Sequence, residues 1–301
     1  MKNLFNKIIN SRHLTLFINF FKSAELSVSS IAVAYYLLLS MFPMLLIIAN
    51  SLPYFNINTT EVMGFLKRNL PEQIYKLLSP GILSIFTKPN TGLFSISIVV
   101  ALWTFSRALS SLQIAMNKAY GVSEHRDFIV SRFFSIVAGF AILLFLYFSI
   151  ALAAFGQMII DQLQNLLHLN NSLYHTLHNM TMPAVALSSF LALALLYTIL
   201  PNVKTKKFRY ILPGTIFSTF VLVFLMSAFG KYIGHAMQNF EDFKIVGSLV
   251  IFALMIWFIF IARVLIIGSI LNAVYQKYDD GQIETRRGEV VGIIKDIRKT
   301  N

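Results

Sequence analysis

Cysteine is absent from the 301-residue chain, so it has no disulfide, no thiolate nucleophile and no Cys-ligated metal site. Glycine and proline together number only 22, and no low-complexity tract occurs, which excludes fibrous and disordered classes. Charged residues make up 13% of the chain, about half the usual share of roughly 25%, whereas hydrophobic residues make up 56%. This composition excludes an ordinary water-soluble domain.

Ionisable side chains are missing from six long segments, each 18 to 35 residues in length. About 20 apolar residues at ~1.5 Å rise cross a hydrocarbon core of ~30 Å. We therefore predict an all-α integral membrane protein with six transmembrane helices. Membrane β-strands are excluded because they alternate apolar and polar residues. The predicted spans are Ile31–Leu52, Leu93–Leu109, Phe133–Phe155, Pro183–Leu200, Ile211–Phe229 and Ile245–Leu271.

The basic residues between the spans predict the orientation. Eighteen Lys and Arg fall in the N-terminal arm, the second and fourth connections and the tail, against six in the other connections. Positive residues favour the cytoplasm, so both termini are expected there. The net charge of +12 is then mainly an orientation signal, and no nucleic-acid partner is expected. The predicted domains are a cytoplasmic arm (1–30), a transmembrane domain (31–273) and a charged cytoplasmic tail (274–301).

Two segments outside the spans show amphipathic patterns. Apolar residues at helical spacing alternate with basic ones in the arm, which predicts an N-terminal helix on the inner leaflet. Packing of that helix against cytoplasmic loops is the alternative. In the first outer loop, Asn58 with Glu61 forms a capping-box pattern and Pro71 begins a second pattern, predicting two short amphipathic helices. These helices would form a lid, lie in the interface or serve as scaffolding.

The first span carries polar groups in an otherwise apolar run, namely Tyr35, Tyr36 and Ser40, followed by Pro43. Proline removes a backbone donor and crowds the carbonyl four residues earlier, so a kink that frees polar backbone is expected at Pro43. Broken helices bind substrate in many transporters. These four residues are therefore binding candidates, with a kink that serves only packing as the alternative.

The second span extends beyond its apolar part. Ser106, Ser110, Gln113 and Asn117 recur on one helical stripe, which predicts a helix that continues to a C-cap at Gly121. Arg107 lies on the neighbouring face. Ser106, Arg107 and Asn117 are binding candidates if the stripe lines a cytoplasmic vestibule, and simple contact with water is the alternative.

Arg263 is a basic residue in the interior of a predicted span, whereas Arg107 lies at the cytoplasmic boundary of the second span. It lies nine positions before Asn272, about 13 Å along a helix, and an intramembrane arginine generally faces a cavity or a partner. No Asp or Glu lies within any predicted span. The hypothesis is that Arg263 and Arg107 contact the phosphate of a lipid-like substrate. Snorkelling of Arg263 to the inner leaflet is the alternative.

Asp161, His168 and His175 are the nearest approach to a metal site. With His178 they share one helical face, but zinc ligands usually lie one turn apart or converge from several elements. The polar face of an interfacial helix is therefore the preferred interpretation. Phosphodiester hydrolysis needs a metal cluster or an acid and base pair, and the remaining His and carboxylates show no such spacing. We expect no catalytic residue and no cofactor.

An ordered set of short motifs resembles the YihY/virulence factor BrkB family of inner-membrane proteins. The resemblance covers roughly residues 20–275. The motifs are Ala34-Tyr35-Tyr36, Ser40 to Pro43, Trp103 to Arg107, Asn117 to Gly121 with Arg126, Leu200-Pro201, Leu212-Pro213-Gly214, Val246-Gly247-Ser248, Trp257, Gly268 and Asn272-Ala273.

This resemblance implies six spans, both termini inside, and a bacterial plasma (inner) membrane. Members of the family were long labelled ribonuclease BN, a label regarded as misassigned, and have been linked to serum resistance and to moving envelope lipids. The chain departs from the family pattern where a Gly-Ala-Glu-Leu-Asn run is replaced by Gly268 to Asn272, and where the tyrosine after Trp257 is Ile259. A role of that glutamate is therefore not transferred.

The favoured function is a multi-pass transporter or flippase for an amphipathic, anionic lipid-like envelope substrate. Membrane lipids are the expected partners, and the sequence does not indicate an oligomeric state. No G-x-x-x-x-G-K-[ST] motif occurs, so energy would come from an ion gradient, a partner or the substrate gradient. The alternative is a non-transporting membrane scaffold for envelope biogenesis, and a ribonuclease is the least favoured.

Overall fold

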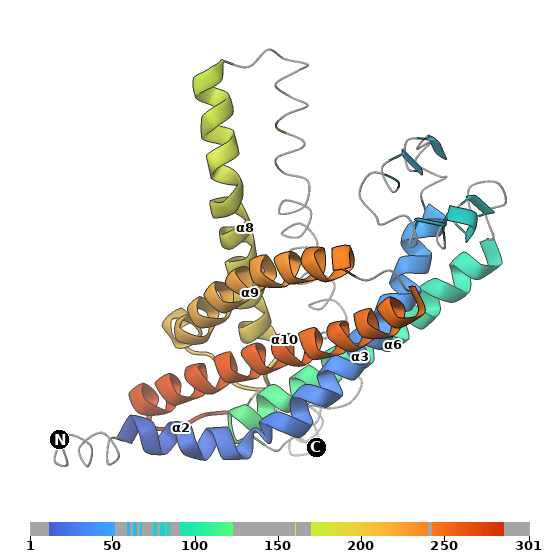
Figure 1. Cartoon of the computed structure of the whole chain (residues 1–301). Helices are drawn as coiled ribbons and strands as arrows, with labels where there is room; N and C mark the ends of the chain where they lie inside the picture. Colours follow the sequence, from blue (N-terminus) through green and yellow to red (C-terminus); the bar gives the residue numbers. More distant parts are fainter. Residues whose placement is uncertain are drawn as a thin grey trace, which may run out of the picture. The chain divides into compact units, whose positions relative to one another are not determined.

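The structure is a computed structural model that describes residues 12–51, 91–122, 170–239 and 243–285, with residue 160 and scattered residues between 59 and 84. These parts are helical (Figure 1). Within them, the one β-type pairing is an isolated antiparallel bridge between Val203 and Thr285. The helices are α2 (Arg12–Ser23), α3 (Leu26–Ser51), α6 (Thr91–Ala119), α8 (Asn171–Ile199), the 3-10 helix η2 (Phe208–Tyr210), α9 (Leu212–Asn239) and α10 (Phe243–Asp280).

Four of these helices are long and apolar enough to cross a membrane. The stretches are Leu26–Met44, Phe94–Ala119, Ser172–Ile199 and Phe252–Asp280. They correspond to the first, second, fourth and sixth predicted spans. The fifth prediction falls in α9, whose described apolar stretch, Leu212–Leu225, is shorter. The predicted third span lies outside the described residues.

The fourth span begins earlier than the sequence predicted. We placed its start at Pro183, whereas α8 begins at Asn171 and contains Pro183 in its interior. The side chain of Asn170 caps the helix by accepting a hydrogen bond from the Ser172 amide (3.4 Å). Pro183 is exposed, so its ring does not lie between packed helices. Proline has no amide to donate to the carbonyl four residues earlier, and α8 continues despite this one missing hydrogen bond.

The N-terminal arm is helical from Arg12, and one side of α2 packs on the rest of the chain. His13 stacks on the Tyr278 ring with centroids 3.9 Å apart, and Phe20 packs against a cluster that includes Tyr120 and Ala273. On its other side Ile18 and Phe21 are exposed. The helix ends at Ser23, and a short turn follows in which Glu25 has a positive φ of 44°. The next helix, α3, begins at Leu26, five residues before the predicted Ile31.

The short outer-loop helices remain a prediction. Residues 59–60, 63–64, 75–76 and 79–81 are helical, but Asn58 and Pro71 lie outside the described residues. The division at residues 30 and 273 is likewise untested. We note only that α10 continues without interruption to Asp280.

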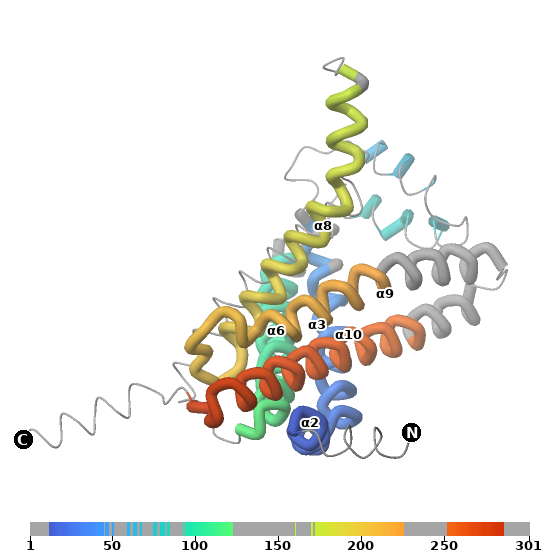
Figure 2. The backbone as a smooth tube through the Cα atoms, turned by 90° about the vertical axis from the view of Figure 1, so that its left-hand side faces the viewer, coloured from blue at the N-terminus to red at the C-terminus, as the bar shows by residue number. Residues whose placement is uncertain are grey.

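The chain forms two compact units, here called unit 1 and unit 2. Unit 1 combines Met1–Ser29, Leu112–Phe224 and Arg263–Asn301, and unit 2 combines Ser30–Ser111 and Leu225–Ala262. Within unit 2, α3 and the first part of α6 run side by side in both views (Figures 1 and 2). Unit 1 contains the described core cluster of Tyr120, Val122, Val203 and Ala273. The segments α6, α9 and α10 each contribute to both units.

The predicted end of α6 is confirmed. Gly121 has a φ of +67°, and its amide donates to the Lys118 carbonyl while the Val122 amide donates to the Asn117 carbonyl (both 2.9 Å). This pair of bonds is the Schellman arrangement, which needs a left-handed residue that glycine adopts without strain. It stops the helix and turns the chain toward Val122, which is buried in the core cluster.

Candidate functional site

The candidate residues on α3 do not divide the helix. Tyr35 is exposed and Tyr36 half-buried, and their rings meet edge to face at 5.3 Å. The Ser40 hydroxyl is buried and donates to the Leu37 carbonyl at 2.8 Å. Pro43 is buried, and α3 continues through it to Ser51. The span therefore does not consist of two half-helices, and Ser40 bonds within its own helix.

Arg107 lies on an exposed face of α6. Its guanidinium is 5.7 Å from the Trp103 ring centroid, a cation–π distance, and Trp103 is 53% exposed. Ile96, Val99 and Ile114 are also exposed on this face, at helical spacing. Ser106, the neighbouring candidate, is half-buried, and its carbonyl accepts from the Ser110 hydroxyl at 2.8 Å. In a bilayer this arrangement places a cation on an outer face of the helix.

The second half of the α6 stripe binds protein backbone. The Gln113 amide donates to the Leu200 carbonyl at 2.9 Å, and the Asn117 side-chain oxygen accepts from the Asn202 amide at 2.8 Å. Leu200 is the C-cap of α8, so Gln113 satisfies a carbonyl that the helix end leaves without a partner, and Asn117 binds the chain two residues beyond the cap. At Gln113 and Asn117 the stripe therefore fastens α6 to the end of α8, an outcome that neither sequence alternative included.

Arg263 is half-buried in the most apolar of the four candidate spans. Its Nε atom is buried, and no hydrogen-bond partner for that atom occurs among the described residues. The acidic side chains described near the end of α10 are Asp279, Asp280 and Glu284, and each has other basic partners. A buried guanidinium nitrogen without a partner is costly, so this position calls for an acceptor.

Four segments of unit 1 meet in a buried polar cluster that we call the four-helix junction, formed by Tyr120, Tyr197, Gly214, Ser218, Gly268 and Asn272. The Tyr197 hydroxyl donates to the Leu265 carbonyl at 3.0 Å and lies 2.6 Å from the Ser218 hydroxyl. The Asn272 side-chain oxygen accepts from the Gly214 amide at 2.6 Å, and the Tyr120 phenol lies against the same side chain. The junction joins the end of α6 to α8, α9 and α10.

Glycine at two positions permits this close approach. A Cβ atom at Gly214 would overlap the Gly268 carbonyl, and one at Gly268 would overlap the Tyr197 hydroxyl and come within 2.5 Å of Ser218 Oγ. Small residues let membrane helices approach closely, and side-chain hydrogen bonds then hold them in one register. The junction is therefore packed closely enough to exclude any larger residue at these two glycines.

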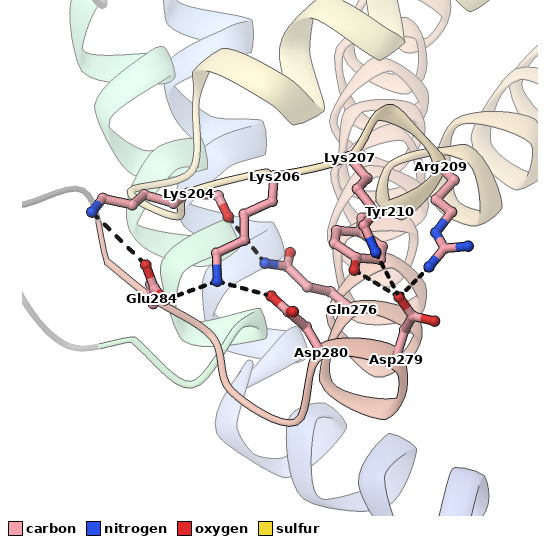
Figure 3. Close-up of polar contacts among 9 residues, drawn as sticks. All are labelled: Lys204, Lys206, Lys207, Arg209, Tyr210, Gln276, Asp279, Asp280 and Glu284. Carbon is pink, nitrogen blue, oxygen red and sulfur yellow. Dashed lines mark hydrogen bonds and ion pairs between the residues drawn. The ribbon is translucent and has the colours of Figure 1, made fainter.

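A second cluster, the connector clasp, joins the segment after α8 to the end of α10 (Figure 3). Lys206 binds Glu284 at 2.8 Å and Asp280 at 3.4 Å, while Lys204 lies 3.8 Å from Glu284. Further backbone and side-chain bonds reinforce it, including Lys204 amide to Glu284 carbonyl at 2.9 Å and Gln276 Nε2 to Lys204 carbonyl at 3.1 Å.

The other half of the clasp converges on Asp279. One oxygen of that carboxylate, Oδ2, accepts from Arg209 and from the Tyr210 hydroxyl (2.7 Å), and Lys207 Nζ lies 3.7 Å away. The basic run that the sequence used as an orientation signal is therefore largely ion-paired. In the half of the clasp around Lys206, the hydrogen bond and charge attraction from Lys206 lower the pKa of Glu284, and the hydrogen bond to Glu284 raises the pKa of Lys206.

Of the three metal candidates, His175 alone lies among the described residues. Asp161 and His168 lie outside the described residues, and His175 is exposed on α8. Searching the described ranges alone finds no group of three or more His, Cys, Asp or Glu side chains able to hold a metal ion. The rings near His175 are Tyr174 and, beyond it, His178, whose buried Nδ1 lacks a hydrogen-bond partner in the described parts.

Of the eight binding candidates, Asn117 alone joins a contact network within unit 1. The sequence did not single out Tyr197, Ser218 or Gln276, which bond between segments 46 to 72 residues apart. The signal that was available is that Tyr197 and Ser218 are polar residues inside charge-free segments. Besides each other, however, they contact backbone carbonyls and a glycine, which leave no pattern in the sequence.

Comparison with known families decides the classification. The family described as virulence factor BrkB matches residues 17–290. The chain belongs to the virulence factor BrkB family. This BrkB-family chain is a membrane protein with at least four helices able to cross a bilayer.

One relative of this BrkB-family protein is described as ribonuclease-like. It is YfkH of Bacillus subtilis (strain 168), which is 29% identical over 259 residues, or 85% of this chain and 90% of YfkH. No solved structure matches the chain.

Several motifs that carry the BrkB resemblance meet in unit 1. Tyr120, Gly214, Gly268 and Asn272 belong to the four-helix junction, and Asn117 bonds the backbone directly after Pro201. These motifs are far apart along the chain, and four of their residues meet in the four-helix junction.

Proposed function

We propose that this BrkB-family protein is a multi-pass plasma-membrane transporter or flippase for an amphipathic, anionic lipid-like substrate. The observation that carries the proposal is Arg263, a half-buried cation in an apolar helix whose Nε has no partner among the described residues. A phosphate or similar anion supplies the acceptor that this position needs. Arg107 places a second cation on an outer face of α6, where an anionic headgroup has access.

The orientation with both termini in the cytoplasm is part of this proposal. It places the connector clasp and the end of α6 at the inner face, and it rests on the 18 basic residues of the predicted cytoplasmic segments. With this orientation the exposed Ile18 and Phe21 of α2 lie at the level of the inner leaflet, which supports an interfacial role for that helix.

We also propose that the protein is not a nuclease, despite the name of its relative YfkH. The carboxylates described at the end of α10 are held by Lys, Arg and Tyr in the connector clasp. Pairing of this kind occupies them in structural bonds. A purified sample that hydrolysed RNA, with loss of activity on substitution of a named residue, would overturn this part of the proposal.

The close packing of the four-helix junction favours a second candidate, a non-transporting membrane scaffold for envelope biogenesis. Gly214 and Gly268 leave no room for a substrate between α9 and α10 at the junction itself. A scaffold needs such fixed helix positions, whereas a transporter needs them only in part of the molecule.

Reconstitution into liposomes separates the two candidates. Vesicles containing headgroup-labelled anionic phospholipid, labelled zwitterionic phospholipid or a labelled lipid-linked saccharide are treated with a membrane-impermeant quencher. A transporter makes the inner-leaflet label of at least one class accessible, faster than in protein-free vesicles. Protein that is folded and monodisperse but moves none of the three classes would favour the scaffold.

A further inference from the structure

The two halves of the connector clasp differ in charge. In one half, Lys204 and Lys206 face Asp280 and Glu284, so two cations meet two anions. In the other half, Lys207 and Arg209 share the single carboxylate of Asp279. One positive charge is therefore in surplus, and it lies at the turn formed by residues 207–209.

This turn also exposes a large apolar side chain. Phe208 is 61% exposed and stands between the two cations, while Tyr210 is fully buried and anchors the turn. The Lys207 and Arg209 side chains lie 5.7 and 5.6 Å from the Tyr210 ring centroid, which keeps both charged groups near one another. Roughly half of each of these two side chains remains accessible.

An apolar stripe on α9 begins soon after the turn. Ile216, Phe220 and Phe224 follow at four-residue spacing and are 57, 74 and 67% exposed. Residues with this spacing share one face of a helix. In a bilayer such a face meets acyl chains. The chain therefore presents a cationic turn and then a row of large apolar side chains.

We propose that the turn at Lys207 and Arg209 binds the phosphate of a resident anionic phospholipid, whose acyl chains lie against Phe208 and the α9 stripe. The surplus cation supplies the charge complement, and basic residues next to membrane helices attract anionic headgroups. Free phosphate gains nothing from four exposed apolar side chains, so the occupant is a lipid. This lipid is not the transported substrate, and the site functions whether or not the protein is a transporter.

Native mass spectrometry of the full chain tests this site. Protein is reconstituted in mixed phosphatidylglycerol and phosphatidylcholine at equal fractions and released in a mild detergent, and the lipid adducts are counted. The parent protein retains phosphatidylglycerol in preference to phosphatidylcholine. In the Lys207→Gln/Arg209→Gln variant, which removes two cations, the preference falls at least about fivefold, the effect expected from the surplus surface cation alone.

The matched control is Lys204→Gln/Lys206→Gln, which removes the same charge from the balanced half and keeps the preference. Phe208→Ser leaves all ion pairs in place and lowers retention of both lipids, so the test survives if the double variant does not fold. Equal retention of the two lipids by the parent protein, an equal loss in both double variants, or displacement of the lipid by inorganic phosphate alone would overturn the proposal. None of these results bears on lipid flux.

Discussion

Unit 1 and unit 2 use their polar side chains differently. In unit 1 several buried polar groups bond between segments, as Asn117 does with Asn202 and Asn272 with Gly214, although Ser188 and Thr215 bond within their own helical turns. In unit 2, the buried Ser40 and Thr104 bond to carbonyls of their own helices. Bonds between helices fix one register, whereas bonds within a helix satisfy a polar group without constraining its neighbour. We therefore expect unit 1 to be the more rigid part of the molecule.

Several residues of the motifs shared with the BrkB family lie in unit 1, the unit that we expect to be more rigid. Tyr120, Gly214, Gly268 and Asn272 are junction residues, whereas Tyr35, Tyr36 and Arg107 belong to unit 2. Motifs shared in a family thus support packing in one unit and expose polar or aromatic groups in the other.

The largest effect is expected at Gly268. Alanine there places a Cβ against the Tyr197 hydroxyl, and overpacking of this kind costs about 1–3 kcal/mol. Unfolding in mixed micelles of increasing SDS fraction, followed by circular dichroism, measures the change. Gly81→Ala is the control, because nothing lies within 4 Å of the added Cβ. If the two substitutions destabilise equally, the junction is not closely packed.

Tyr197→Phe tests the bonds between helices. It removes the hydroxyl that donates to the Leu265 carbonyl and contacts Ser218, at an expected cost of about 1 kcal/mol in the same assay. Ser40→Ala removes a bond within one helix, and the cost should be smaller, about 0.5 kcal/mol or less. A larger loss at Ser40 than at Tyr197 would reverse the comparison between the units.

A smaller, pH-dependent effect is expected at the connector clasp. Lys206 lowers the pKa of Glu284, so this pair stabilises the clasp above the ordinary glutamate pKa of about 4.3, and the stabilisation is lost as pH falls through the lowered value. The pKa of Lys206 is raised, so its contribution is present below the ordinary lysine pKa of about 10.4 and is lost as pH rises through the raised value.

Loss of the clasp can be followed with a spin label next to Glu284. Because the chain has no cysteine, Gln282→Cys introduces a single attachment site for the label. Label mobility should stay low at neutral pH and rise below about pH 4. In Lys206→Gln the label should already be more mobile at neutral pH. A transition centred near neutral pH, well above the range of a glutamate carboxyl, would contradict this assignment.

Local patterns in the sequence were sufficient to predict most of the helices. Charge-free length identified α3, α6, α8 and α10 as apolar helices, and the stripe from Ser106 to Asn117 with Gly121 predicted how α6 ends. Both signals depend on neighbours along the chain. The predicted fourth span begins at Pro183, inside α8, because charge-free length marks the apolar part of a helix and not the polar turns that precede it.

The candidate site was less accessible to sequence reasoning. Arg263 was identified because a lone charge in an apolar run is unusual, and the structure adds that its Nε lacks a partner among the described residues. The junction and the clasp were missed because Tyr197 meets Leu265, and Lys206 meets Glu284, across about 70 residues or more. Such pairing follows from how the helices pack, and a single sequence does not record it.

The most direct test of the proposed function is lipid flux through Arg263 variants in liposomes. Arg263→Leu removes the cation and its hydrogen bonds, whereas Arg263→Lys keeps the charge on a side chain of similar length. At equal reconstituted amounts, the Leu variant should lose flux of the anionic lipid and the Lys variant should retain a part of it. Flux in the Leu variant equal to that of the parent protein would contradict the account.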